Sequence, residues 1–249
     1  MKNVNVRFWL LSGALLLASG AIVGYQTTYR SHANSFAPFV AHIVRKHFSP
    51  GGAAEPVAES YHSYARRRDG SRVHMFRVTS PNGETAQMVE ISDLQTGKSV
   101  ILEPFTKSSI TVPLTGEQIE QRRRAESECA SNRGVVVEDN GEKMGVPVTR
   151  LRDEFGAGFV VDGWISPELG CLALSELAES KSGAHNETLV TQLITSDPPD
   201  DLFKVPQGYT ERSPAQVDQV YSERYNGNTL FGKKVLDTIE HRYHSGKPY

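Results

Sequence analysis

Residues 73–92 read VHMFRVTSPNGETAQMVEIS. The dipeptide Asn82-Gly83 follows Pro81 and supplies the positive φ values that a tight hairpin turn needs. The runs on either side of it are rich in β-branched and aromatic residues, which are typical of strands. The stretch therefore predicts an antiparallel hairpin whose two strands are Val73–Thr79 and Glu84–Ser92.

The same alternation of short strands and turn signals extends from Tyr61 to about Thr195, at intervals of roughly 8 to 12 residues. One of the predicted turns is Asp139-Asn140-Gly141. A single helix interrupts the strands, because Thr115 and Gln118 form a capping box, and we expect it to run from Gly116 to about Glu128. The central part of the chain is therefore predicted to be an antiparallel β-meander.

The segments on either side of the meander carry helical patterns. Phe36, Phe39, Val40, Ile43, Val44 and Phe48 recur at helical spacing and predict an amphipathic helix, and the Gly- and Pro-rich residues 49–56 predict a linker. Near the C-terminus, Ser213, Pro214 and Gln216 predict the capped start of a helix, and a second helix can begin at Asn228.

The N-terminus has the order of charges and apolar residues found in export signals. Lys2 and Arg7 flank the uncharged run Phe8–Gly24. The run is also close to the ~17-residue lower limit for a membrane-spanning helix. Both a cleaved signal peptide and an uncleaved anchor remain open, and Ile22 and Val23 favour the anchor because they prolong the apolar run. We expect an exported, periplasmic protein that is anchored to the inner membrane, with a cleaved, soluble or secreted form as the alternative.

The chain contains two cysteines, Cys129 and Cys171. Both lie beyond the export signal, in a compartment where disulfides persist, so one bridge between them is predicted. The alternative is two separate buried thiols. Neither residue belongs to a Cys-x-x-Cys pair, which disfavours a catalytic cysteine.

The charge balance excludes one class of partner. The chain has 27 Lys+Arg against 29 Asp+Glu, a net charge of -2, which is not the charge of a globally basic nucleic-acid-binding protein. The local runs Arg66–Arg68 and Arg122–Arg124 are interpreted as solvated faces. No nucleic-acid partner is therefore expected.

The motifs for cofactors, metals and catalysis are incomplete. Gly227, Gly232 and Lys233 have the spacing of a phosphate-binding loop, but Lys234 replaces the required Ser/Thr. His241 and His244, with Glu240 beside them, are too few ligands for a metal site. Neither a serine elbow nor a zinc-protease helix occurs. The sequence therefore predicts no cofactor, no metal and no catalytic residue, and favours a protein that is not an enzyme; an unrecognised hydrolase remains the last-ranked alternative.

One family resemblance emerges from the segment Asp200–Tyr209, which reads DDLFKVPQGY, together with the hairpins between Tyr61 and Leu114 and the turn Trp164–Leu169. These resemble uncharacterised bacterial exported proteins related to the periplasmic lipoprotein-carrier fold, over about residues 60–210. The resemblance implies a curved antiparallel sheet with helices against its concave face. In some relatives it also implies a hydrophobic cavity for lipid or acyl chains.

The sequence thus predicts an α+β fold in which a curved antiparallel meander sheet of about 9–10 strands has helices packed against it. The expected regions are a signal or anchor (1–33), a helix and linker (34–56), the sheet domain (57–210) and a C-terminal helical extension (211–249). The leading hypothesis is an envelope protein that binds a lipid or another apolar ligand in the curved sheet. The alternative is an interaction module that binds an envelope protein through its surface and C-terminal helices.

Overall fold

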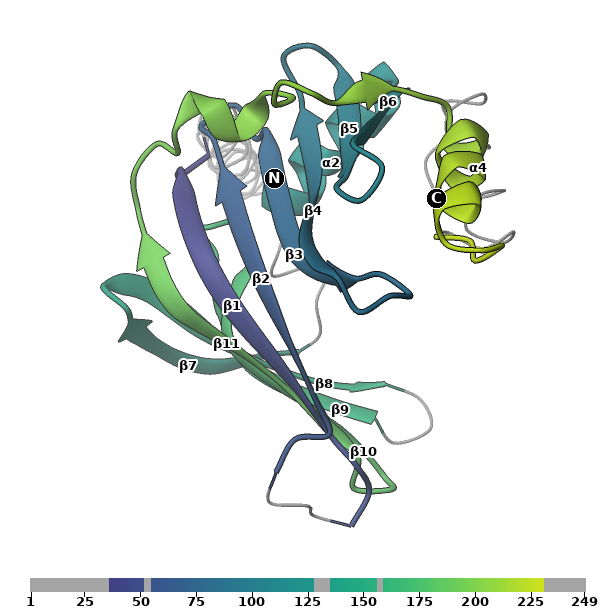
Figure 1. The fold of residues 1–249 in the computed structure, drawn as a ribbon. Coiled ribbons are helices and arrows are strands. Elements are labelled where there is room, and N and C mark those ends of the chain that lie inside the picture. Colours follow the sequence, from purple (N-terminus) through teal and green to yellow (C-terminus); the bar gives the residue numbers. More distant parts are fainter. Residues whose placement is uncertain (1–35, 52–54, 128–134, 156–158, 231–249) are drawn as a thin grey trace, which may run out of the picture. The chain divides into compact units, whose positions relative to one another are not determined.

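The structure is a computed structural model that describes residues 36–51, 55–127, 135–155 and 159–230, all within one compact unit that begins at Phe36. Its elements, shown in Figure 1, are β1 (Phe39–Phe48), β2 (Ala58–Arg66), β3 (Arg72–Thr79), β4 (Thr85–Asp93), β5 (Lys98–Glu103), β6 (Ser108–Pro113), α2 (Gly116–Ser127), β7 (Val135–Lys143), β8 (Val146–Phe155), β9 (Phe159–Ser166), β10 (Leu172–Ser180), β11 (His185–Ile194), the 3-10 helix η1 (Asp200–Phe203), β12 (Thr210–Glu211) and α4 (Pro214–Arg224).

All twelve strands form one curved, unclosed sheet in the order β12-β6-β5-β4-β3-β2-β1-β11-β10-β9-β8-β7 (Figure 1). Every neighbouring pair is antiparallel except β12 and β6, which are parallel. The predicted curved antiparallel sheet is confirmed. It has more strands than expected, and the fold is mostly β, with two α-helices among the described residues.

The largest correction concerns residues 36–48, for which a helix was predicted. Residues 39–48 form β1, which pairs with β2 on one side and β11 on the other and so joins the two halves of the sheet. Ala41 and Ile43 are buried on one face, and Val40 packs against the cluster on the other. The first half of β1 carries apolar residues on both faces, and the positions 39, 40, 43 and 44 among them also satisfy a helical pattern.

Residues 49–56 were predicted to be a linker before the sheet domain, and this prediction is wrong. Residues 49–57 are the loop of a hairpin, because they connect the paired strands β1 and β2. The backbone N–H of Val57 donates to the carbonyl oxygen of His47 at 2.8 Å, at the end of this hairpin. The sheet therefore begins at Phe39, and the boundary near residue 57 expected from the sequence does not separate two regions.

The register divides the sheet into two faces. Face A carries the cross-strand row Ala41, Tyr64, His74, Glu90, Ile101 and Ile110. Face B carries the neighbouring row Val40, Ala65, Val73, Ile91, Val100 and Thr111. Neighbours in a row share a face because side chains alternate along each strand.

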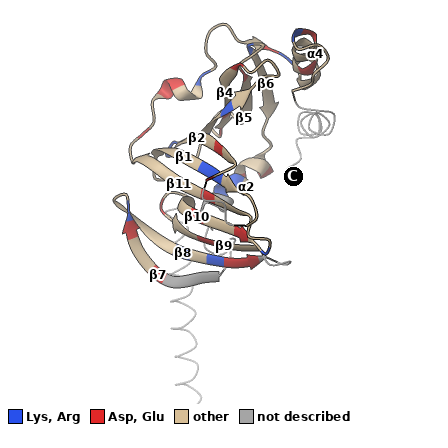
Figure 2. Ribbon diagram, turned by 60° about the horizontal axis from the view of Figure 1, so that its bottom comes forward, with Lys and Arg blue, Asp and Glu red and all other residues tan. Residues whose placement is uncertain are grey.

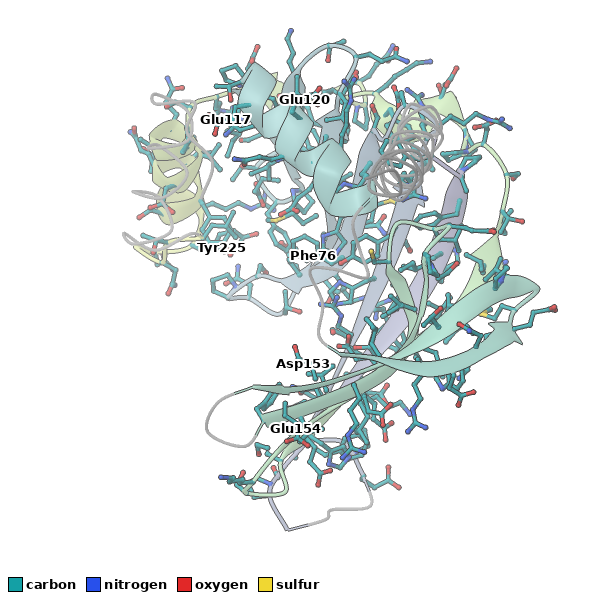
Figure 3. The ribbon with its side chains drawn as sticks, turned by 180° about the vertical axis from the view of Figure 1, so that it is seen from behind. Phe76, Glu117, Glu120, Asp153, Glu154 and Tyr225 are labelled. Carbon is teal, nitrogen blue, oxygen red and sulfur yellow. The ribbon has the colours of Figure 1, made fainter. Side chains whose placement is uncertain are left out.

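Both α-helices lie on face A at the β4–β6 end of the sheet. Val217 of α4 packs in a buried cluster with Ile110 and Val112, and Arg122 of α2 donates a hydrogen bond to Ser92 of β4. In Figure 3 these helices lie at one end of the sheet, whereas Asp153 and Glu154 of β8 lie at the other. Face B of β2–β5 is covered instead by Phe203 of η1.

The local turn and capping signals are largely confirmed. The hairpin β3–β4 forms as predicted, although only Gly83, and not Asn82, has a positive φ. Both capping boxes are present, with the side-chain oxygen of Thr115 or Ser213 accepting from the backbone N–H three residues later. These signals are read correctly because they depend on neighbours in sequence.

One predicted turn is wrong. Residues 139–141 lie inside β7, and the chain reverses instead at Met144 and Gly145, which both have positive φ. A side chain at Gly141 would meet the Trp164 ring, 3.4 Å from the position of its Cβ, so this glycine makes room for an aromatic ring of β9. Glycine in a strand often marks such a close approach.

Candidate functional site

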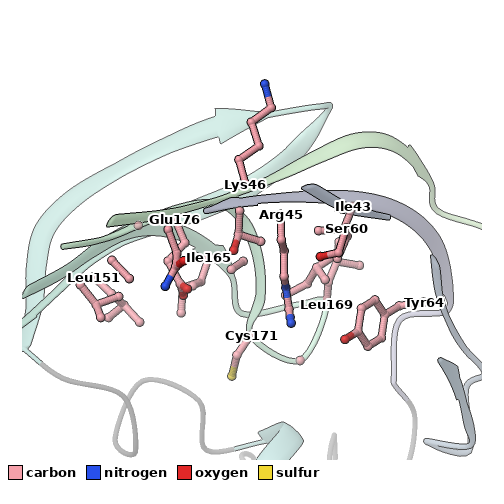
Figure 4. Close-up of a pocket in the computed structure, with 18 of the residues that line it drawn as sticks. Ile43, Arg45, Lys46, Ser60, Tyr64, Leu151, Ile165, Leu169, Cys171 and Glu176 are labelled. Atoms are coloured by element: carbon pink, nitrogen blue, oxygen red, sulfur yellow. The ribbon is translucent and has the colours of Figure 1, made fainter. Parts of the chain in front are cut away.

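A large hollow lies on face A, and none of the residues that line it belongs to α2 or α4. It has a volume of about 890 Å³ and extends over β2, β1, β11, β10, β9 and β8 (Figure 4). Its floor is therefore the sheet itself. A cavity of this size is within the range of small-molecule sites in proteins.

Two adjacent cross-strand rows make up much of this floor. The inner row is Ser60, Arg45, Thr188, Glu176, Gly163 and Leu151. The outer row is Ala58, His47, Asn186, Ala178, Val161 and Asp153. All twelve residues line the cavity, which shows that the antiparallel register alone places them on one surface.

The apolar part of the lining is well buried. Phe39 and Ile43 come from β1, Leu151 and Ile165 from β8 and β9, and Leu169 from the turn before β10; each is less than 8% exposed. Burial of these side chains stabilises the fold, and their outer surfaces give the cavity an apolar wall.

Gly163 has a steric reason to be glycine. A Cβ at this position would lie 2.9 Å from the carbonyl oxygen of Ser175, on the neighbouring strand β10. No side chain fits there without a shift of the backbone, and the missing side chain leaves open the centre of the cavity floor, opposite Glu176.

Two charged side chains of the inner row stand out, Arg45 and Glu176. In Figure 4 Arg45 extends to the same side of the sheet as Leu169 and Cys171, whereas Lys46 extends to the other side. Among the described residues, neither Arg45 nor Glu176 takes part in an ion pair. The cavity therefore combines an apolar wall with a cation and an anion that are not paired with each other.

Arg66 also lines the cavity but has a structural role. It is 1% exposed, donates to the carbonyl oxygens of Ala37 and Glu168, and lies over the rings of Phe36 and Phe39. The interpretation of residues 66–68 as a solvated face is thus wrong for Arg66. A buried guanidinium needs hydrogen-bond acceptors, and backbone carbonyls supply them here.

Beside the cavity, four rings stack on face A of β2 and β3: His62, Tyr64, His74 and Phe76. The Nδ1 of His62 and the Nε2 of His74 are 3.0 Å apart, and the rings of Tyr64 and His74 are stacked with centroids 4.2 Å apart. Burial, with the nearby charge of Arg45, lowers the pKa of His62 to about 4. His62 is therefore neutral at pH 7.

The sequence-derived candidates have mixed outcomes. Cys171 is buried in the cavity lining, but Cys129 lies outside the described residues, so their disulfide stays a prediction. Residues 231–249, with His241, His244, Gly232 and Lys233, also lie outside them, as does the predicted signal or anchor at 1–33.

In the part of the chain that is described, no helix is long and apolar enough to cross a membrane. In that same part, no group of His, Cys, Asp or Glu side chains is placed to hold a metal ion.

Sequence reasoning missed the charged row of the cavity. The predicted helix from Phe36 to Phe48 gives Arg45 no place on a sheet, and no sequence motif marks Glu176. Alternation through Phe39, Ala41, Ile43 and Arg45 was the available signal, since it places Arg45 on the face of three buried residues. Charge is distributed without an obvious concentration elsewhere: in Figure 2 blue and red segments are interspersed along the strands and α4.

Comparisons with known proteins give likenesses of fold at low sequence identity. No protein-family profile and no curated protein sequence matches the chain. Among solved structures it is similar to an uncharacterised conserved protein from Thermus thermophilus, with 9% identity, a TM-score of 0.43, and coverage of 76% of this chain and 99% of that one. It is similar to MucB, solved in complex with MucA(peri), with 16% identity, a TM-score of 0.32, and coverage of 73% and 57%.

A LolA superfamily protein from Nitrosomonas europaea is also among the similar structures, with 10% identity, a TM-score of 0.32, and coverage of 72% of this chain and 96% of that one. The resemblance expected from residues 60–210 is therefore found among solved structures as well. Similarity at this level carries no inference about function, which has to be argued from the cavity.

Proposed function

We propose that the protein is a non-enzymatic, exported protein of the cell envelope that binds the apolar chain of a lipid in the face A cavity. The observation that carries the proposal is the cavity of about 890 Å³ on face A, whose lining comes from the strands and the turn before β10 and includes no residue of α2 or α4. Apolar side chains form one wall of it, and an apolar ligand that covers them removes their remaining surface from water.

The fold supports entry of a flexible chain. Strands of one sheet and the turn before β10 supply the described lining. We expect a ligand to enter from face A, without separation of two packed sheets. The predicted N-terminal signal or anchor would place this domain next to a membrane, which is a source of acyl chains.

A cavity-filling variant tests the proposal in the full chain. Thr188 is half-buried in the middle of the floor, so Thr188→Trp would occupy the ligand volume. Gln192→Trp is the matched control, because Gln192 is exposed on the same strand and pairs with the exposed His42.

Cells producing each form would be fed a photoreactive fatty acid and irradiated, and lipid adducts would be mapped by peptide mass spectrometry. We expect adducts on peptides of β8–β10 in the native chain and in Gln192→Trp, with a large loss in Thr188→Trp. Adducts confined to residues 1–35, or equal in all three forms, would reject the cavity as the binding site. That result would favour the alternative of an interaction module.

A further inference from the structure

We propose that the ligand of the cavity is a zwitterionic amphiphile, with its anionic group bound by Arg45 and its ammonium group bound by Glu176. This inference rests on the proposed function, because it assigns the head group of a ligand whose chain occupies the apolar part of the cavity. Its chemical class is a phospholipid that carries a primary amine, such as phosphatidylethanolamine.

The first argument is the position of the two charges. Arg45 of β1 and Glu176 of β10 both pair with Thr188 of β11, which lies between them in the inner row. Since neighbouring strands are about 4.8 Å apart, their backbones are separated by about 10 Å. The side chain of Arg45 is hydrogen-bonded to Tyr64 of β2. A phosphate and an ammonium group joined by a short linker are of a size to lie between two charged side chains that share one face at this spacing.

The second argument is that neither charge is paired with a charge of opposite sign, although Arg45 is hydrogen-bonded to Tyr64. No ion pair among the described residues involves Arg45 or Glu176. Arg45 is exposed and Glu176 is half-buried, so both are reached by water in the free protein, and groups of opposite charge on a ligand would replace that water on binding. The planar guanidinium of Arg45 can donate two parallel hydrogen bonds to a phosphate. The carboxylate of Glu176 only accepts hydrogen bonds, so it suits the ammonium group instead.

The third argument is that other charged lining residues are already engaged or lie elsewhere. Arg66 is held by backbone carbonyls, and His47 has Nδ1 2.6 Å from the side-chain oxygen of Asn186. Lys46 extends from the opposite side of the sheet in Figure 4. Arg72 has its own interactions, and Asp153 lies in the outer row, opposite Val161.

The pair also provides selectivity. A purely anionic head group seated on Arg45 would lie close to the negative charge of Glu176, which would repel it. An uncharged head group would leave both side chains without a partner of opposite charge. The zwitterion alone satisfies both, so we expect the order phosphatidylethanolamine, then phosphatidylglycerol, then diacylglycerol.

The test uses the full chain in vesicles of equal parts phosphatidylethanolamine and phosphatidylglycerol. Trace amounts of three photoreactive lipids with the same chains are added separately: phosphatidylethanolamine, phosphatidylglycerol and diacylglycerol. Adducts on peptides of β8–β10 are counted by mass spectrometry. The variants are Arg45→Gln, Arg45→Lys and Glu176→Gln, and Lys46→Gln is the control for loss of a neighbouring charge on the opposite face.

In the native chain and in Lys46→Gln we expect the photoreactive phosphatidylethanolamine to exceed diacylglycerol by about tenfold or more, since a hydrogen bond to a charged group contributes that much to affinity. Arg45→Gln should lower adducts of both phospholipids, phosphatidylglycerol to the level of diacylglycerol or below it, whereas phosphatidylethanolamine keeps the contact of its ammonium group with Glu176. Arg45→Lys should restore part of the loss. Glu176→Gln should make the two phospholipids equal. Glycerophosphoethanolamine, which lacks chains, should compete poorly.

Equal cavity adducts for all three lipids in the native chain would overturn the head-group assignment and leave the proposed function standing. A preference for phosphatidylglycerol would overturn the role of Glu176. Full competition by glycerophosphoethanolamine would overturn the requirement for an acyl chain. The absence of cavity adducts with every lipid, diacylglycerol included, would reject the proposed function itself.

Discussion

Face A of the sheet has two ends that differ in what covers them. At the β4–β6 end, α4 and α2 lie on the strands, and the side chains beneath α4 are apolar, with Ile110 fully buried. At the β1 and β8–β11 end, no residue of α2 or α4 lines the cavity, and apolar side chains lie beside Arg45, Thr188 and Glu176. Burial of apolar side chains beneath α4 thus stabilises the fold at one end of the sheet. At the other end, polar and charged side chains of the same sheet can contact a ligand.

The difference follows from the cost of burying charge. An unpaired guanidinium or carboxylate beneath α4 would be removed from water with no partner, which is strongly unfavourable. In the open cavity, water or a ligand can reach Arg45 and Glu176. Four predictions measure how far this contrast between the two ends holds.

The largest expected effect is a truncation beneath α4. Ile110→Ala should lower the free energy of unfolding by about 2–5 kcal/mol, because Ile110 is 0% exposed and packs against Val217. Val161→Ala in the cavity should cost less than half as much, since Val161 is only half-buried. Equal losses in urea denaturation would mean that the open end is packed as tightly as the covered end.

The second prediction concerns Cys129 and Cys171. If they are bridged, a reducing agent should lower the free energy of unfolding by about 2–4 kcal/mol in the chain-entropy view. Titration of thiols in the denatured, unreduced protein should then find none. Two titratable thiols would show separate cysteines, and the stability of the cavity end would not depend on a covalent link.

A third, smaller effect is expected at the helix caps of the covered end. Ser213→Ala removes the side-chain acceptor for the backbone N–H of Gln216 and should cost about 1 kcal/mol. Ser213→Gly should cost only a few tenths of a kcal/mol, because glycine tolerates the cap conformation. A similar loss in both variants, measured by thermal unfolding, would show that the cap hydrogen bond contributes little.

The smallest expected effect is a pH dependence from the ring stack beside the cavity. The pKa of His62 is about 4 in the folded chain, below its model-peptide value of 6.5, so the unfolded chain binds the proton more tightly. The stability contributed by neutral His62 is therefore fully present above about pH 6.5 and is lost as the pH falls toward 4. The effect is small because His62 is partly open to water.

His62→Gln should flatten this part of the pH profile of unfolding. Burial is the main cause of the lowered pKa of His62, and the positive charge of Arg45 is the second cause. Arg45→Gln should therefore raise the pKa of His62 and shift the pH profile of unfolding to higher pH. An unchanged profile in His62→Gln would assign the pH dependence to other groups.

The sequence by itself determined the local features of this protein. The hairpin around Gly83, with its two strands, and the capped starts of both helices depend on residues close together in the chain. The structure has them where the pattern predicts, to within a residue at the strand ends. Such signals act over a few residues, through backbone conformation and short hydrogen bonds.

Only the tertiary structure decided the rest. Residues 39–48 fit a helical and a strand pattern, and pairing with β2 and β11, far apart in sequence, makes them a strand. Gly141 lies in a strand because β7 pairs with β8, where Gly141 is opposite Val148. The cavity depends most on tertiary structure, because the register of β1, β11 and β10 brings Arg45, Thr188 and Glu176 into one row. The pairing register of strands far apart in the chain cannot be read from the residues of any one strand.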